Sequence, residues 1–151
     1  MQKVRLEDMQ GFARQVLERV DSAQGAAYVL ALQGDLGAGK TTFTQALAKE
    51  LGVEGAVQSP TYVLMKSYSI AFKEFTKLVH IDAYRLEKPE EFAALKPASF
   101  LQDQEALVVV EWPERVQGEL PKPNLTIQFS ANDPADVASA ANEEERYIEI
   151  V

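Results

Sequence analysis

One segment of the sequence has the residue types and the spacing of a phosphate-binding loop. The residues Gly34-x-x-x-x-Gly39-Lys40-Thr41 match the Walker A pattern at every fixed position. Glycines let the backbone turn successive N–H groups toward a phosphate, and a helix that begins there directs its positive end to the same place. Lys40 could then contact the β- and γ-phosphates, and the Thr41 hydroxyl could bind Mg²⁺. The alternative is a glycine-rich turn that binds nothing, but such a turn does not require a Lys-Thr pair.

Two acidic residues each follow an apolar run that is typical of a buried strand. Asp82 follows residues 78–81, and Glu111 follows residues 106–110. Open α/β sheets bind ligands at the carboxyl ends of their strands, and phosphoryl transfer needs charge neutralisation and in-line positioning. One acid could therefore hold the metal while the other orients the attacking water, and the sequence leaves both assignments open. The alternatives are an N-cap or turn role for Asp82 and a solvated strand-end carboxylate for Glu111.

Further polar and aromatic residues have chemistry that such a site could use. A hydroxyl of Ser59 or Thr61 could contact the γ-phosphate or the metal, although an ordinary proline turn explains SPTY (59–62) as well. Trp112 follows Glu111 and could stack on a base or pack in the core. His80 lies in the middle of a predicted strand, which favours a hydrogen-bonded structural imidazole over a catalytic one. Arg85 could stabilise charge, or it could serve in a structural ion pair.

The elements that would position these residues alternate along the chain. Strands are expected at residues 28–32, 62–68, 78–82, 106–110, 125–129 and 147–151, and helices at residues 6–20, 40–51 and 89–95. The polar residues 73–77 predict a turn, and the polar, acidic stretch 130–145 predicts a mobile loop. The last two apolar runs alternate with polar residues, which predicts outer strands.

The order of these elements predicts the fold class. Strand, loop, helix and further buried strands are typical of an α/β protein. We therefore expect one P-loop NTPase-like domain over residues 1–151, with three α/β/α layers. Its mixed sheet would have a mainly parallel core and antiparallel outer strands.

Composition excludes several other kinds of site and of protein. The 151 residues include no cysteine and one histidine, which excludes thiolate chemistry and a three-histidine zinc site. The net charge of -8 argues against a protein that grips nucleic acid by itself. No apolar run reaches the roughly 18 residues of a membrane span, and the N-terminus is charged where a signal peptide is apolar. We expect a cytoplasmic protein without membrane contact.

Four short motifs occur in an order that resembles one protein family. The segments GDLGAGKTTF (34–43), SPTY (59–62), HIDAYRL (80–86) and EWPE (111–114) are similar to those of the TsaE family, also called YjeE. The resemblance covers about residues 1–129 and implies a small P-loop fold that binds ATP or ADP with Mg²⁺. It also implies slow ATP hydrolysis by the protein alone and action in a complex with TsaD and TsaB. That complex attaches a threonylcarbamoyl group to the adenosine beside the anticodon, so tRNA would be reached only indirectly.

The resemblance also implies a role for each motif residue. Lys40 would contact the phosphates, Thr41 and Glu111 would be the Mg²⁺ ligands, and Asp82 would support the metal or the attacking water. Residues 59–62 would form a switch-like segment beside the nucleotide. The nucleotide-binding set would be Gly34, Asp35, Leu36, Gly37, Ala38, Gly39, Lys40, Thr41, Thr42, Ser59, Thr61, Trp112 and Glu114.

Two other functions remain open on the sequence. A small metabolite kinase is usually longer and carries an arginine-bearing lid, whereas the six arginines here are scattered and no lid insertion is evident. A nucleotide-gated binding module would use ATP only as an assembly switch. A GTPase is disfavoured because the guanine-binding pattern Asn-Lys-x-Asp is absent from the sequence.

Overall fold

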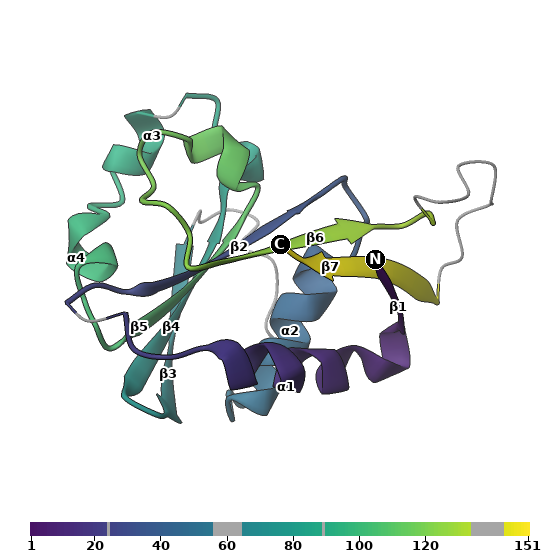
Figure 1. The fold of residues 1–151 in the computed structure, drawn as a ribbon. Coiled ribbons are helices and arrows are strands. Elements are labelled where there is room, and N and C mark those ends of the chain that lie inside the picture. The colour runs from purple at the N-terminus through teal and green to yellow at the C-terminus, as the bar shows by residue number, and fades with distance from the viewer. Residues whose placement is uncertain (24, 56–64, 89, 134–143) are drawn as a thin grey trace.

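The computed structural model describes residues 1–151 except 24, 56–64, 89 and 134–143, and within the described residues seven strands form one sheet (Figure 1). The strands are β1 (Gln2–Arg5), β2 (Tyr28–Gly34), β3 (Met65–Phe72), β4 (Phe75–Asp82), β5 (Ala106–Glu111), β6 (Leu125–Ser130) and β7 (Glu145–Ile150). Their order in the sheet is β1-β7-β6-β2-β5-β4-β3.

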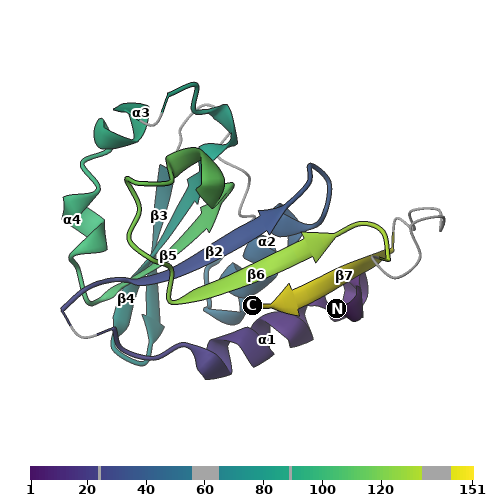
Figure 2. The same cartoon turned by 45° about the horizontal axis from the view of Figure 1, so that its top comes forward.

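Helices and 3-10 turns cover both faces of this sheet. They are η1 (Leu6–Asp8), α1 (Met9–Arg19), α2 (Lys40–Glu50), η2 (Ala83–Arg85), α3 (Glu90–Ala93), α4 (Ala98–Leu101) and η3 (Pro113–Val116). The long helices α1 and α2 lie on one face, and the short helices α3 and α4 lie on the other (Figures 1 and 2). Each face has its own apolar core. One includes Phe43 and Leu47 of α2, and the other includes Phe92 of α3 and Phe100 of α4. The predicted three-layer α/β/α arrangement is confirmed.

The centre of the sheet is parallel and its margins are antiparallel, as predicted. β2 runs parallel to β5 and β6, and β4 runs parallel to β5. β3, β7 and β1 each run antiparallel to a neighbour. β6 differs from its prediction as an outer strand, because it lies between β2 and β7. Its alternation arises because Ile127 and Phe129 are buried under the helix layer while its other side chains are only half-buried.

The sequence missed two short elements and misplaced several boundaries. β1 and α4 had no prediction, and β1 offers only one buried residue, Val4, as a signal. The predicted helix 6–20 begins with the 3-10 turn η1. β3 is described from Met65 to Phe72, four residues beyond the predicted end, and residues 62–64 of the predicted strand lie outside the described part of the chain. Of the predicted 130–145 loop, Ser130 and Glu145 belong to strands and residues 134–143 are not described.

The parallel strands bring their carboxyl ends to one edge of the sheet. Asp82 of β4 lies opposite Glu111 of β5, and Glu111 lies opposite Leu32 of β2. The glycine-rich loop leaves the end of β2 at this same edge and enters α2. None of the described helices has the length and apolar character that crossing a membrane requires.

Candidate functional site

The loop between β2 and α2 depends on glycine at both of its ends. Gly34 has a φ of 147°, and a Cβ atom there would lie 2.5 Å from the backbone oxygen of Phe129. Gly39 has a φ of 110° and is the residue that precedes the first turn of α2. Both backbone conformations are strained for any other residue. The chain can therefore turn tightly and present the N-terminus of α2 to an anion.

Lys40 is held inside this loop. Its Nζ donates a hydrogen bond to the backbone oxygen of Gly34 and another, at 2.8 Å, to that of Asp35. The ammonium also lies 4.1 Å from the centroid of the Trp112 ring, within cation–π range. Burial lowers the pKa of Lys40, while the negative charges of nearby carboxylates, first that of Glu111, act in the opposite direction. The structure thus holds a positive charge ready at the end of β2.

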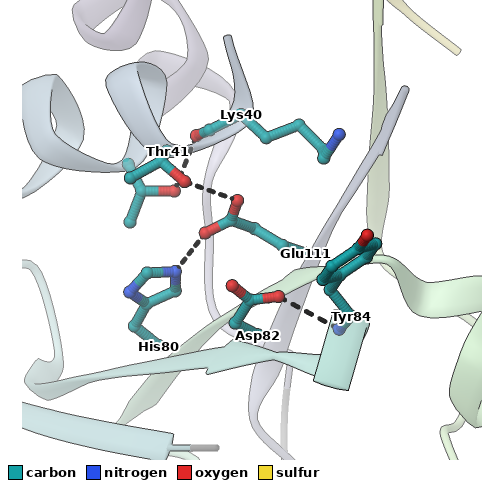
Figure 3. A network of polar contacts seen from close by, with 7 residues as sticks. Lys40, Thr41, His80, Asp82, Tyr84 and Glu111 are labelled. Atoms are coloured by element: carbon teal, nitrogen blue, oxygen red, sulfur yellow. Dashed lines mark hydrogen bonds and ion pairs between the residues drawn. The ribbon is translucent and has the colours of Figure 1, made fainter. Parts of the chain in front are cut away.

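The two predicted acids lie side by side below Lys40 (Figure 3). The Thr41 hydroxyl donates to Glu111 Oε1 at 2.9 Å, and Glu111 is almost fully buried. Asp82 Oδ1 accepts a hydrogen bond from the backbone N–H of Tyr84 at 3.1 Å, which caps η2. Asp82 therefore has the N-cap role that the sequence left open, and it also lines the same hollow as Glu111. Glu111 is not a solvated strand-end carboxylate.

Trp112 covers one side of this hollow. Its backbone is left-handed, with φ 61°, and its N–H donates to the backbone oxygen of Leu32 at 3.2 Å. The ring is half-buried and packs against Tyr84, with 5.1 Å between the ring centroids. The side chain packs against the apolar core on the side of α3 and α4 and also lines the hollow. It borders the site, where its ring can contact a bound ligand.

The hollow has a volume of about 530 Å³, within the range of small-molecule sites. Its lining combines loop, strand-end and turn residues: Leu36, Gly37, Gly39, Lys40, Thr41, Thr42, Asp82, Tyr84, Arg85, Glu111, Trp112 and Arg146. The sequence-predicted residues of the loop, the two acids and Trp112 are thus brought together. Arg85, whose role the sequence left open, also lines the hollow.

Some predicted residues take other positions. Gly34 and Asp35 contribute carbonyl groups that hold Lys40, and Ala38 is buried beneath the loop. Glu114 is exposed on η3 and lines a neighbouring hollow of about 300 Å³. Ser59 and Thr61, with the rest of the switch-like segment, lie outside the described residues.

Sequence reasoning missed two residues of the hollow. Tyr84 comes two residues after Asp82 and lies within the motif HIDAYRL (80–86), and this position was the signal that could have found it. Arg146 enters from β7, where the side chain passes Gly39: a Cβ on that glycine would lie 3.3 Å from Arg146 Cγ. No sequence pattern connects Arg146 with a loop that lies about a hundred residues earlier.

The oxygen ligands at this edge suit a Mg²⁺ ion that is shared with phosphate groups, and they are too few for a metal site built from protein side chains alone. Among the described residues no three His, Cys, Asp or Glu side chains cluster as ligands. Mg²⁺ is usually bound by one or two carboxylates together with phosphate oxygens, at about 2.0–2.1 Å. The Thr41 hydroxyl and the Glu111 carboxylate lie next to each other at this edge, so they could hold Mg²⁺ together with the phosphates of a nucleotide.

Comparisons with known proteins point to one family. A family model described as "Threonylcarbamoyl adenosine biosynthesis protein TsaE" matches residues 4–139. Proteins named tRNA threonylcarbamoyladenosine biosynthesis protein TsaE are 38% identical over 109 residues in Haemophilus influenzae and 37% identical over 126 residues in Streptomyces coelicolor. The first match covers 72% of this chain and 66% of the Haemophilus protein, and the second covers 82% and 83%. This chain thus spans slightly under two thirds of the length of the Haemophilus protein.

A solved structure shares the fold. The crystal structure of Bacillus subtilis YdiB matches with a TM-score of 0.66 and 25% sequence identity, over 99% of this chain and 84% of that one. The likeness extends over the whole seven-stranded sheet, because nearly all of this chain is covered. It confirms the predicted α/β fold class.

Proposed function

This chain belongs to the TsaE family of threonylcarbamoyl adenosine biosynthesis proteins, and from this premise we propose that it binds ATP or ADP with Mg²⁺ and hydrolyses ATP in that pathway. Its cycle of binding and hydrolysis supports repeated turnover by the TsaD–TsaB transferase. The protein reaches tRNA only through that complex, in keeping with its net charge of -8.

The observation that carries this proposal is the meeting of four side chains at one sheet edge. Lys40, Thr41, Asp82 and Glu111 all line the same hollow, at the N-terminus of α2. This combination of a cation, a hydroxyl and two carboxylates beside a helix N-terminus suits a nucleoside triphosphate with magnesium. A glycine turn without a ligand would need neither the buried ammonium nor the buried Glu111.

Each residue has a separate task in the proposed reaction. The Lys40 ammonium leaves the carbonyls of Gly34 and Asp35 and contacts the β- and γ-phosphates. Thr41 and Glu111 hold Mg²⁺, which when bound neutralises negative charge on the phosphates. Asp82, fixed by its hydrogen bond from the Tyr84 N–H, orients the attacking water. Positioning and charge neutralisation then account for catalysis without a covalent intermediate.

A reconstitution experiment tests the proposal. The protein is mixed with TsaB and TsaD, with and without ATP, and both co-elution and tRNA modification are measured. We expect complex formation that depends on nucleotide and modification of more than one tRNA per transferase. Calorimetry with ADP and with ATP, each at saturating Mg²⁺, provides the simpler check. If neither nucleotide gives a heat of binding, the proposal is contradicted at its first step.

A phosphate-transfer assay separates this function from a metabolite kinase. The cation, the hydroxyl and the two carboxylates that line the hollow suit hydrolysis of a nucleotide, and Arg85 and Arg146 lie at its edges. We therefore expect phosphate release to water and no labelled product with small hydroxyl acceptors.

Substitution of Asp82 distinguishes ATP hydrolysis as the function from a protein that uses ATP binding only as an assembly switch. Loss of turnover with assembly intact would favour hydrolysis as the function.

A further inference from the structure

His80 makes a contact that the proposed chemistry does not yet use. It lies in the middle of β4, is fully buried, and is the only histidine of the sequence. Its Nε2 atom lies 2.5 Å from Glu111 Oε2, and the other carboxylate oxygen accepts from the Thr41 hydroxyl at 2.9 Å (Figure 3). The Glu111 carboxylate is thus held at both oxygens.

The direction of the contact with His80 follows from hydrogen-bonding chemistry. An ionised carboxylate only accepts hydrogen bonds, so His80 Nε2 must carry the proton. The Nδ1 atom is buried and has no hydrogen-bond partner among the described residues. In this contact His80 Nε2 is therefore the donor and Glu111 Oε2 the acceptor.

The Glu111 carboxylate needs the hydrogen bond from His80 because both the Thr41 hydroxyl and the Lys40 ammonium can attract it. The terminal torsion of a glutamate is broad, so the carboxylate plane is not fixed by rotamer preference. Glu111 is also the carboxylate with the largest electrostatic effect on Lys40. A free Glu111 could turn toward the ammonium and neutralise the charge that the phosphates need. With Oε2 bound to His80, Oε1 accepts from the Thr41 hydroxyl at 2.9 Å.

We propose that His80 is a positioning residue, which orients Glu111 so that Oε1 and the Thr41 hydroxyl together face the metal position. This inference rests on the proposed function, since it takes that metal to be the Mg²⁺ of the bound nucleotide. His80 itself touches neither nucleotide nor metal. Groups that orient metal ligands in this way typically change metal affinity by 10- to 100-fold when they are replaced.

Two substitutions of His80 form a matched pair. In His80→Gln the amide nitrogen can occupy the position of Nε2, whereas in His80→Asn it reaches only as far as Nδ1. The measurement is the Kd for ADP by calorimetry, once with Mg²⁺ and once with EDTA, and the readout is the ratio of the two. We expect the Asn variant to lose about 10-fold or more of the gain in affinity that Mg²⁺ provides. The Gln variant should stay close to wild type, and both should keep their EDTA affinity.

A general structural role for His80 would give a different result. Equal losses in the Gln and Asn variants, or losses that are as large in EDTA as in Mg²⁺, would overturn the proposal. So would a wild-type Mg²⁺ response in the Asn variant.

The proton on Nε2 gives a second test that needs no nucleotide and no variant. Because the chain has a single histidine, ¹⁵N spectra of the imidazole of the wild-type protein at neutral pH report on His80 alone. We expect a proton on Nε2. An Nε2 atom without a proton would overturn the inference, because it could not donate to Glu111. If ADP fails to bind while this proton is observed, the proposed function fails and the contact between His80 and Glu111 stands.

Discussion

Replacing Lys40 by methionine removes the ammonium and keeps the apolar stem of the side chain. In the free protein Nζ donates to the backbone oxygens of Gly34 and Asp35. A bound nucleotide replaces these neutral acceptors by phosphate oxygens, and a hydrogen bond to a charged group is worth about 1.5–3 kcal/mol. Because the variant cannot form one or two such hydrogen bonds, its binding should be weaker by about 2–4 kcal/mol. The Kd for ADP should therefore rise roughly 30- to 700-fold.

The same substitution should leave folding stability nearly unchanged. Burial lowers the pKa of Lys40, which means that the fold disfavours the charged ammonium at this position. Methionine removes that cost, while the two carbonyls of Gly34 and Asp35 lose a donor. Because these effects oppose each other, we expect a change in the free energy of unfolding below about 1 kcal/mol. A binding defect without a folding defect is the specific expectation.

The assay is calorimetry with ADP and Mg²⁺, together with thermal unfolding of each variant. Lys49→Met is the matched control, because Lys49 is exposed in the last turn of the same helix and its loss changes the net charge equally. We expect the Lys49 variant to bind like the wild type. Wild-type affinity in a folded Lys40→Met variant would refute the assignment of the loop. Equal weakening in both variants would show that only overall charge matters.

Three further predictions follow from the same geometry. Because burial lowers the pKa of Lys40, part of the free protein has a neutral Lys40 at alkaline pH, and bound phosphates should return the proton to this amine. ADP binding at alkaline pH should therefore take up protons. Calorimetry in buffers of different ionisation enthalpy should show this uptake in the wild type but not in Lys40→Met. Glu111→Ala should reduce Mg²⁺-dependent ATP hydrolysis more than ADP binding in EDTA, and a normal rate would make Asp82 the principal acid. Gly34→Ala places a Cβ 2.5 Å from a backbone oxygen and should lower the free energy of unfolding in urea by about 2–4 kcal/mol, whereas Gly37→Ala, with open space around it, should cost less; similar values for the two would contradict the argument from close approach.

The phosphate loop and its two acids could be predicted because their signals are local or follow from topology. The loop motif lies within consecutive residues, so its chemistry can be recognised without knowledge of the fold. Asp82 and Glu111 lie 29 positions apart in the sequence, yet each ends a buried strand. Parallel strands bring such ends to one edge, and the register indeed places the two residues opposite each other.

The rest of the sheet had no comparable signal. β1 is four residues long and pairs with β7, so its only stabilising partner strand lies at the other end of the sequence. The alternation in β6 indicates that one face is covered, but it does not say which strands lie on either side. The position of Arg146 in the hollow depends on the same long-range pairing of β7. None of these features could be inferred from a window of neighbouring residues.

Trp112 shows why the last part of a site is the hardest to predict. The sequence left two roles open for it, a core residue or a stacking surface, and neither prediction specified its backbone conformation. Its left-handed backbone costs about 1–2 kcal/mol for a residue with a side chain, and the sequence contains no mark of it. The bond from its N–H to Leu32 and the packing of its ring on Tyr84 maintain that conformation. This conformation places the ring against the Lys40 ammonium. The motif EWPE identified the residue, but the left-handed turn that orients its ring could be seen only in the structure.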